Sequence, residues 1–116
     1  MNKEKVTRFY ADLDSSAALA AQYFAPDASF RFCNLSPIVG RENIASFLQG
    51  FFDTISGTVH SVENHDVTEG GSTLVELRVT FVRKDDTTLE GPGAVIFEEN
   101  EDGIRDYRVY GDYSTL

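Results

Sequence analysis

The stretch that decides the fold is Asp27–Phe52, which reads DASFRFCNLSPIVGRENIASFLQGFF. Around Phe30 and Phe32 apolar residues alternate with polar ones, which is typical of a strand. Pro37 and Gly40 then favour a loop and a turn. Beyond them apolar residues recur every three or four positions and predict a helix over about 41–52, with an apolar face of Ile44, Phe47, Leu48, Phe51 and Phe52. A strand and a helix joined in this way share one core only if the helix folds back across the sheet.

Two further helices are expected before this stretch. Residues 3–13 place four apolar side chains on one helical stripe, namely Val6, Phe9, Tyr10 and Leu13. The run Asp14–Ser16 is typical of a helix cap, and 17–24 is rich in good helix formers. We expect Pro26 to end this second helix.

The rest of the chain has the pattern of strands. Strands are predicted at about 28–34, 58–68, 73–83, 89–98 and 104–113, with turns at 70–71, 84–87 and 100–103. The clearest alternation is that of Val75, Leu77, Val79 and Phe81 with polar residues. The sequence therefore predicts a single α+β domain over 1–116, in the order α-α-β-α-β-β-β-β. Its three N-terminal helices would pack on a strongly curved, mainly antiparallel sheet that forms a cone-shaped barrel.

Composition excludes several classes of partner. The 116 residues include 19 acidic and 10 basic side chains, a net charge of -9 that disfavours nucleic acid. The single Cys33 forms no internal disulfide, no spacing suggests a metal site, and no cofactor is expected. The start of the chain lacks the apolar run of a signal peptide or a membrane span. We therefore expect a cytoplasmic protein that does not associate with membranes.

A cavity is expected beside two glycines of the predicted strand 89–98. Gly91 and Gly93 alternate onto the same face as Val95, and the missing side chains leave either a bend or an empty volume. The residues expected to line this volume are Tyr10, Phe30, Phe32, Asn34, Leu77, Val79, Gly91, Gly93, Val95, Tyr107 and Val109. A small, largely apolar molecule with one or two oxygens would suit such a lining.

Three segments resemble one known family. They are YFAPDASF at 23–30, VGRENI at 39–44, and DGI at 102–104 followed by RVYGD at 108–112. In this order and at these separations they resemble the SnoaL-like polyketide cyclase and ketosteroid isomerase branch of the nuclear-transport-factor-2-like superfamily. The resemblance covers nearly the whole chain. It implies a cone-shaped α+β barrel with a pocket between helices and sheet, often paired as a dimer through the outer face of the sheet.

The resemblance also bears on chemistry. Ketosteroid isomerases use a carboxylate base together with a tyrosine and a neutral carboxylic acid that stabilise an oxyanion. The base and acid positions correspond here to Phe32 and Gly93, so isomerisation of steroids is not expected. SnoaL-like cyclases use a buried aspartate, for which Asp112 is the nearest candidate. The alternation of the last strand also allows Asp112 to be an outer ion-pair partner of Arg78 or Arg108.

The two histidines are the remaining proton carriers. His60 and His65 lie five positions apart. Because this separation is odd, their side chains point to opposite faces of a regular strand, and at most one of them is internal. The candidate catalytic residues are therefore His60 and Asp112.

Two functions remain open. The first is a pocket protein acting as an isomerase, cyclase or dehydratase on a small apolar oxygenated substrate. The second is a module without catalysis that binds a ligand or forms a dimer. The predicted dimer face is the convex side of the sheet, with Glu76, Arg78, Thr80, Glu90, Ala94, Ile96 and Tyr110.

Overall fold

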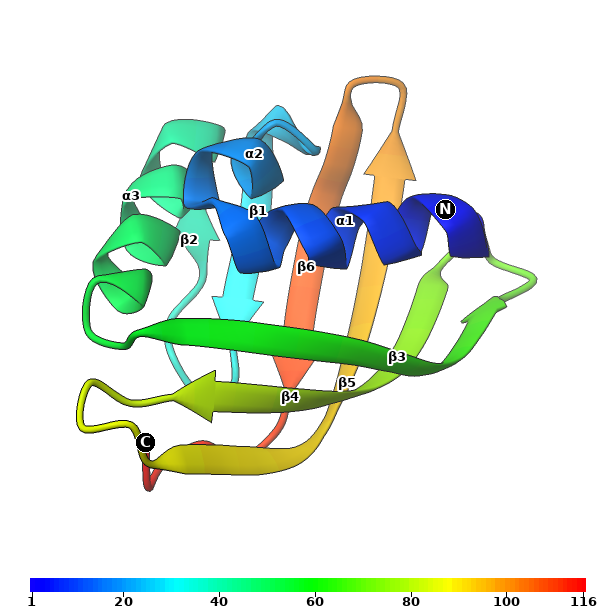
Figure 1. Cartoon of the computed structure of the whole chain (residues 1–116). Coiled ribbons are helices and arrows are strands. Elements are labelled where there is room, and N and C mark those ends of the chain that lie inside the picture. The colour runs from blue at the N-terminus through cyan, green and yellow to red at the C-terminus, as the bar shows by residue number, and fades with distance from the viewer.

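The computed structural model covers residues 1–116 and shows three helices on one side of a six-stranded sheet (Figure 1). The helices are α1 (Lys3–Ser15), α2 (Ala17–Ala21) and α3 (Arg41–Phe52). The strands are β1 (Phe24–Phe32), β2 (Ile38–Val39), β3 (Gly57–Val67), β4 (Thr73–Val82), β5 (Thr88–Asn100) and β6 (Gly103–Tyr110). The α+β class and the order of the long elements are as predicted.

The sheet is mixed, open and strongly bent. Its strand order is β2-β1-β6-β5-β4-β3, and only the β1–β6 pair is parallel. β5 pairs with β4 along its first part and with β6 along its second part, and Figure 1 shows it curving between strands that run almost crosswise. The curvature wraps the concave face of the sheet around the helices, which places the core between the two layers.

The helices begin where the sequence provides caps. The Asn2 side chain accepts a hydrogen bond from the backbone N–H of Lys5 at 2.8 Å, and the predicted stripe of Val6, Phe9, Tyr10 and Leu13 is buried. Ser16 caps α2 by accepting a hydrogen bond from the N–H of Leu19. α3 spans the predicted residues and buries Ile44 and Leu48. No helix is both long and apolar enough to cross a lipid bilayer.

The start of β1 differs from the prediction. α2 ends at Ala21, and the strand already begins at Phe24, which pairs with Ile104 of β6. Pro26 therefore lies within the strand and does not end the helix. It falls where the β1–β6 register shifts between Phe24 and Ser29, a place where a residue without an N–H is tolerated.

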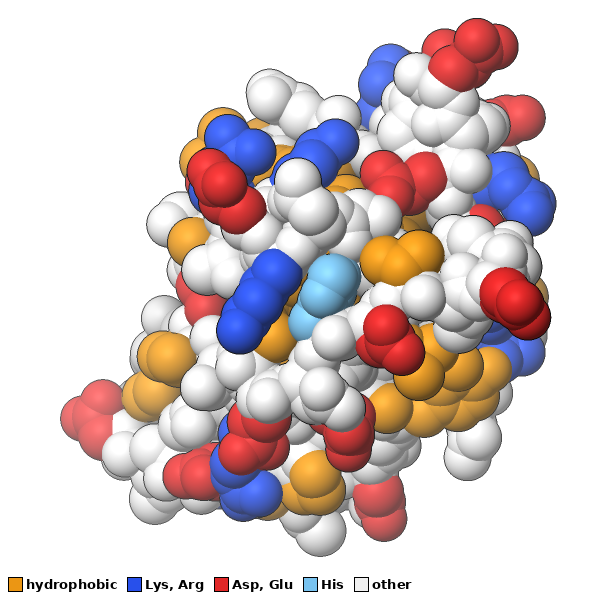
Figure 2. Space-filling view, turned by 90° about the vertical axis from the view of Figure 1, so that its right-hand side faces the viewer, with side chains coloured by type: hydrophobic (Ala, Val, Ile, Leu, Met, Phe, Trp, Pro, Cys, Tyr) orange, Lys and Arg blue, Asp and Glu red, His pale blue; other side chains and the backbone are white.

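The surface carries mixed charge. On the face shown in Figure 2, Lys and Arg side chains are interspersed with a larger number of acidic ones, in line with the net charge of -9. The basic residues do not gather there into the continuous patch that a polyphosphate would need.

Candidate functional site

A cavity of about 60 Å³ lies between the helices and the concave face of the sheet. Of its 20 lining residues 17 are hydrophobic, so an occupant would be surrounded mainly by hydrocarbon. The lining comprises Phe9, Tyr10, Leu13, Phe24, Phe30, Phe32, Phe47, Leu48, Phe51, Phe52, Thr58, His60, Leu77, Val79, Phe81, Gly93, Val95, Tyr107, Val109 and Tyr113. Five of these residues carry a hydroxyl or an imidazole group: Tyr10, Thr58, His60, Tyr107 and Tyr113.

His60 is held at the cavity wall by Asp14. Nδ1 of the His60 ring lies 2.6 Å from Oδ1 of Asp14, and the backbone N–H of His60 donates to Oδ2 of the same carboxylate at 2.8 Å. The hydroxyl of Thr58 also donates to Asp14, at 2.8 Å. The ring stacks on Tyr10 with their centroids 5.2 Å apart. The imidazole is thus fixed by a carboxylate at one nitrogen and by an aromatic face.

This arrangement sets the tautomer of His60. Burial alone would raise the pKa of the Asp14 carboxyl, but the hydrogen bonds from His60 and Thr58 outweigh burial and keep its pKa below the usual value. An ionised carboxylate only accepts hydrogen bonds, so Nδ1 of His60 carries the hydrogen. In the neutral ring Nε2 then bears the free lone pair, and no protein group bonds to it. His60 is therefore poised to accept a proton at Nε2.

Asp14 lies in the last turn of α1, where the helix dipole disfavours a negative charge. The helix dipole therefore does not stabilise this carboxylate. Three hydrogen bonds from β3 offset the cost. The carboxylate is thus stabilised by the strand that carries His60.

The second polar element is a pair of tyrosines. The hydroxyls of Tyr10 and Tyr107 lie 2.9 Å apart, and both side chains are buried. Burial raises the pKa of both hydroxyls above its usual range, so both stay protonated at neutral pH. The pair has two hydrogens but one mutual hydrogen bond, and neither oxygen bonds any other protein group. One O–H therefore remains free to donate to an oxygen atom inside the cavity.

Together these groups offer both halves of an acid–base site. His60 supplies a lone pair, and the Tyr10–Tyr107 pair supplies a donor in surroundings of low polarity, where a hydrogen bond to developing negative charge is strong. No three His, Cys, Asp or Glu side chains lie close enough together to hold a metal ion.

Most residues expected from the sequence meet at this cavity. Those that line it are Tyr10, Phe30, Phe32, His60, Leu77, Val79, Gly93, Val95, Tyr107 and Val109. Gly91 lies on the same face of β5, yet it does not line the cavity and a Cβ added there would meet open space.

Asn34 and Asp112 do not reach the cavity. β1 ends at Phe32, and Cys33 adopts a left-handed backbone conformation with φ of 54° that turns the chain and leaves Asn34 exposed. β6 ends at Tyr110, so its alternation does not extend to Asp112. Asp112 is exposed and accepts a hydrogen bond from the N–H of Ser114. The predicted ion pair with Arg78 or Arg108 is absent, because Arg78 pairs with Glu90 and Arg108 with Glu98 and Asp106.

The expectation for the two histidines is corrected by a β-bulge. His60 pairs with Val79 and His65 with Val75, and both partners belong to the buried face of β4. The register shifts between Val62 and Asn64, which restores His65 to the face of His60. His65 does not line the cavity, and its Nε2 lies 2.8 Å from the backbone carbonyl of Met1.

Sequence reasoning missed Asp14, Thr58 and Tyr113. In the sequence, Asp14 has the position of a helix-cap residue. Its spacing of four from Tyr10 could have placed it on the inner face of the helix. Tyr113 follows the last strand, where no periodicity indicates its direction.

Comparison with known proteins supports the fold. No functionally curated protein is detectably similar to the chain in sequence. A hypothetical protein of Catenulispora acidiphila with a ketosteroid isomerase-like fold, in complex with trimethylamine, superimposes with a TM-score of 0.87 at 17% identity, over 100% of this chain and 91% of that one. A putative SnoaL-like polyketide cyclase of Jannaschia sp. CCS1 gives 0.78 at 19% identity, over 94% and 83%.

A third relative has a named enzyme type. The epoxide hydrolase/cyclase-like enzyme SalBIII, implicated in pyran ring formation in the polyether salinomycin, gives a TM-score of 0.82 at 14% identity, over 97% of this chain and 91% of that one. At these identities the structures share the fold alone. The family model for the SnoaL-like domain matches residues 6–107. The chain therefore belongs to the SnoaL-like family.

Proposed function

We propose that the protein binds a small, largely apolar carbonyl compound in its cavity and transfers a proton on it, as an isomerase, cyclase or dehydratase does. The observation that carries this proposal is the His60–Asp14 pair at the wall of an otherwise apolar cavity. A histidine oriented by a carboxylate, with its other nitrogen unbonded, is the usual arrangement of a general base.

The proposed step is the abstraction of a proton from the carbon next to a carbonyl group. Nε2 of His60 takes the proton, and the electron pair of the C–H bond moves towards the carbonyl oxygen. The free O–H of the Tyr10–Tyr107 pair donates to that oxygen as negative charge develops. In a β,γ-unsaturated ketone the protonated His60 returns the proton to the γ carbon, the enolate electrons form the conjugated C=C bond, and an isomerisation is complete. In a β-hydroxy ketone the protonated His60 gives the proton to the hydroxyl group, which leaves as water while the enolate electrons form the C=C bond of the dehydrated product.

The lining limits the kind of ligand. No Lys or Arg side chain borders the cavity, so a carboxylate or phosphate would find no cationic partner there. A volume of about 60 Å³ holds only a few heavy atoms, and a steroid is far too large for it. We infer a neutral compound with one carbonyl oxygen.

Binding can be tested with butanone as a probe, by NMR of the His60 ring. We expect the Cε1–H signal of His60 to shift on titration with butanone, because the ligand lies against the imidazole. The double variant Tyr10→Phe, Tyr107→Phe removes the donor and keeps the rings, so its affinity for butanone should fall by about three- to tenfold, the effect of one neutral hydrogen bond. Butanone binding that leaves the His60 signal unmoved would contradict the proposal.

A second candidate is the binding of a small amine without catalysis. It is favoured by the aromatic rings that make up much of the lining, since aromatic faces attract alkylammonium ions, and by the trimethylamine bound to the Catenulispora acidiphila relative. A titration with trimethylamine in place of butanone separates the two. If the cavity is an amine-binding site, trimethylamine should bind more tightly than butanone.

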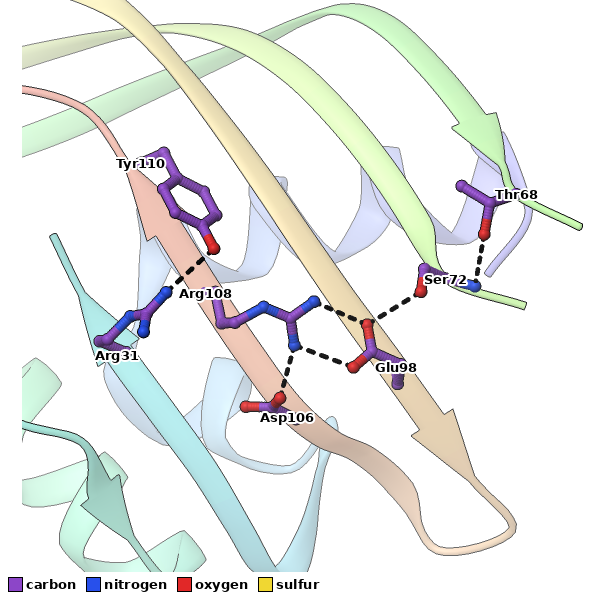
Figure 3. A network of polar contacts seen from close by, with 7 residues as sticks. All are labelled: Arg31, Thr68, Ser72, Glu98, Asp106, Arg108 and Tyr110. Atoms are coloured by element: carbon purple, nitrogen blue, oxygen red, sulfur yellow. Dashed lines mark hydrogen bonds and ion pairs between the residues drawn. The ribbon is translucent and has the colours of Figure 1, made fainter. Parts of the chain in front are cut away.

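We also propose a homodimer through the outer face of the sheet. Several charged groups on this face already have partners within the chain: Arg108 bonds Glu98 and Asp106, Glu98 accepts from Ser72, and Arg31 donates to the Tyr110 hydroxyl (Figure 3). A charged group that keeps such a partner loses less on desolvation. Ile96 and Tyr110 of the predicted dimer face contribute apolar area to the contact.

Sedimentation of the wild type at tens of micromolar should give a dimer mass. The variant Ile96→Arg places an unpaired charge at the centre of the proposed contact and should shift the mass to that of a monomer, while Glu63→Arg on the exposed β3 edge serves as the control. A wild type that stays monomeric over this range would contradict the dimer.

A further inference from the structure

Four aromatic rings close one end of the cavity. The centroid of Phe32 lies 5.6 Å from that of Phe51, Phe51 lies 5.9 Å from Phe81, Phe81 lies 5.1 Å from Tyr113, and Tyr113 lies 5.9 Å from Phe32. The four rings thus form a closed circuit, and all four line the cavity. Phe32, Phe51 and Tyr113 are only half-buried, so this end lies next to solvent.

Tyr113 differs from the other three aromatic residues because it belongs to no helix or strand. Phe32 belongs to β1, Phe51 to α3 and Phe81 to β4, whereas Tyr113 lies in the segment 111–116 that follows β6. The end of the chain lies beside the start of β5, at the edge of the molecule (Figure 1). The Tyr113 hydroxyl has one hydrogen bond, to the backbone carbonyl of Pro92 at 3.2 Å, which is longer than the usual O–H···O distance of about 2.5 to 3.0 Å.

Two glycines make room for this ring. A Cβ added at Gly93 would lie 2.5 Å from the Tyr113 hydroxyl oxygen, and one added at Gly111 would lie 2.6 Å from the same atom. The space expected above Gly93 from the sequence is therefore occupied by Tyr113. The cavity is therefore the part of this space that the Tyr113 ring does not fill.

The size of that volume makes the ring a limiting wall. A cavity of about 150 Å³ is known to hold benzene, and the one here measures about 60 Å³. A ligand with a ring therefore needs one wall to move. The three neighbours of Tyr113 are fixed by helix or sheet, while the tail is held by a hydrogen bond from Arg83 to the carbonyl of Thr115 and by the packing of Leu116 against the core.

We propose that Tyr113 is the specificity-determining residue of the site, because its ring sets the largest ligand that the cavity admits. This inference rests on the proposed function for the nature of the ligand, a neutral ketone. With Tyr113 in place the cavity takes compounds of about the size of butanone. With the ring swung outwards, the space over Gly93 and Gly111 joins the cavity and admits a fused two-ring ketone.

The test compares dissociation constants for butanone and for 2-tetralone, a two-ring ketone, in the wild type and three variants. We expect Tyr113→Ala to bind 2-tetralone at least about tenfold more tightly than the wild type, and butanone within about threefold of it. Tyr113→Phe keeps the ring and should match the wild type for both. Tyr113→Leu removes the ring but keeps a smaller apolar side chain, so it should tighten 2-tetralone binding in the same direction by a smaller factor.

Tyr113→Leu also carries the test if Tyr113→Ala fails to fold, since it keeps an apolar side chain in contact with the rings of Phe32 and Phe81. The proposal is overturned if folded Tyr113→Ala and Tyr113→Leu bind 2-tetralone no more tightly than the wild type, or if Tyr113→Phe gains as much as Tyr113→Ala. A change in size preference without a shift of the His60 signal would retain Tyr113 as the limiting wall and reject the proton-transfer function. Failure of both ketones to bind any of the proteins would overturn both proposals.

Discussion

Replacing Asp14 with alanine is expected to lower the free energy of unfolding by about 2 to 3 kcal/mol at pH 7. The change removes an acceptor that serves three hydrogen bonds, from the Thr58 hydroxyl and from the backbone and ring of His60. Thr58 is 8% exposed, so its hydroxyl would lose its partner in a place that water hardly reaches. Chemical denaturation of wild type and variant measures the difference.

The loss should depend on pH in one direction. The pKa of Asp14 is lower in the folded protein than in the unfolded chain, so its charge adds stability that is fully present above the unfolded value of about 3.9. As the pH falls through the lower folded value, this contribution disappears. The difference between wild type and Asp14→Ala should therefore shrink in acid, as the pH falls from about 4 through the lower folded value.

Asp102→Ala provides a matched control, because Asp102 is an exposed acid in the β5–β6 turn. Its effect should stay within about 0.5 kcal/mol. An Asp14→Ala protein as stable as this control would show that the carboxylate does not hold β3 to α1.

Patterns of hydrophobic periodicity predicted the fold because they reflect burial. The alternation of Val75, Leu77, Val79 and Phe81 and the helical stripe that contains Tyr10 are both buried as expected. The same reasoning placed Tyr10, Tyr107 and Gly93 at one cavity, since inward positions of a curved sheet converge.

Predictions from periodicity failed where a strand is irregular or ends. The β-bulge beside Val62 reverses the parity of β3, and the left-handed Cys33 turns Asn34 outwards. Neither residue is a glycine, so neither irregularity has a strong local signal. Asp14 was missed for another reason: a carboxylate near the end of a helix resembles a cap until the partner strand is in place.

Loss of the imidazole should have the largest effect on chemistry. If His60 removes a proton next to the carbonyl group of a bound ketone, His60→Ala should slow that step by about 10² to 10⁴, the usual contribution of a general base. His65→Ala is the control, since His65 faces the same side of the sheet but does not line the cavity. Its rate should stay within about twofold of the wild type, because it supplies no group to the ligand.

Exchange of the α-hydrogens of butanone for deuterium, followed by proton NMR in D₂O at neutral pD, measures this step directly and needs no knowledge of the natural substrate. The wild type and His65→Ala should accelerate the exchange above the rate in buffer, and His60→Ala should return it to that rate. Exchange at the buffer rate in the wild type, or equally fast exchange in His60→Ala, would contradict the role of His60 as the base of this cavity.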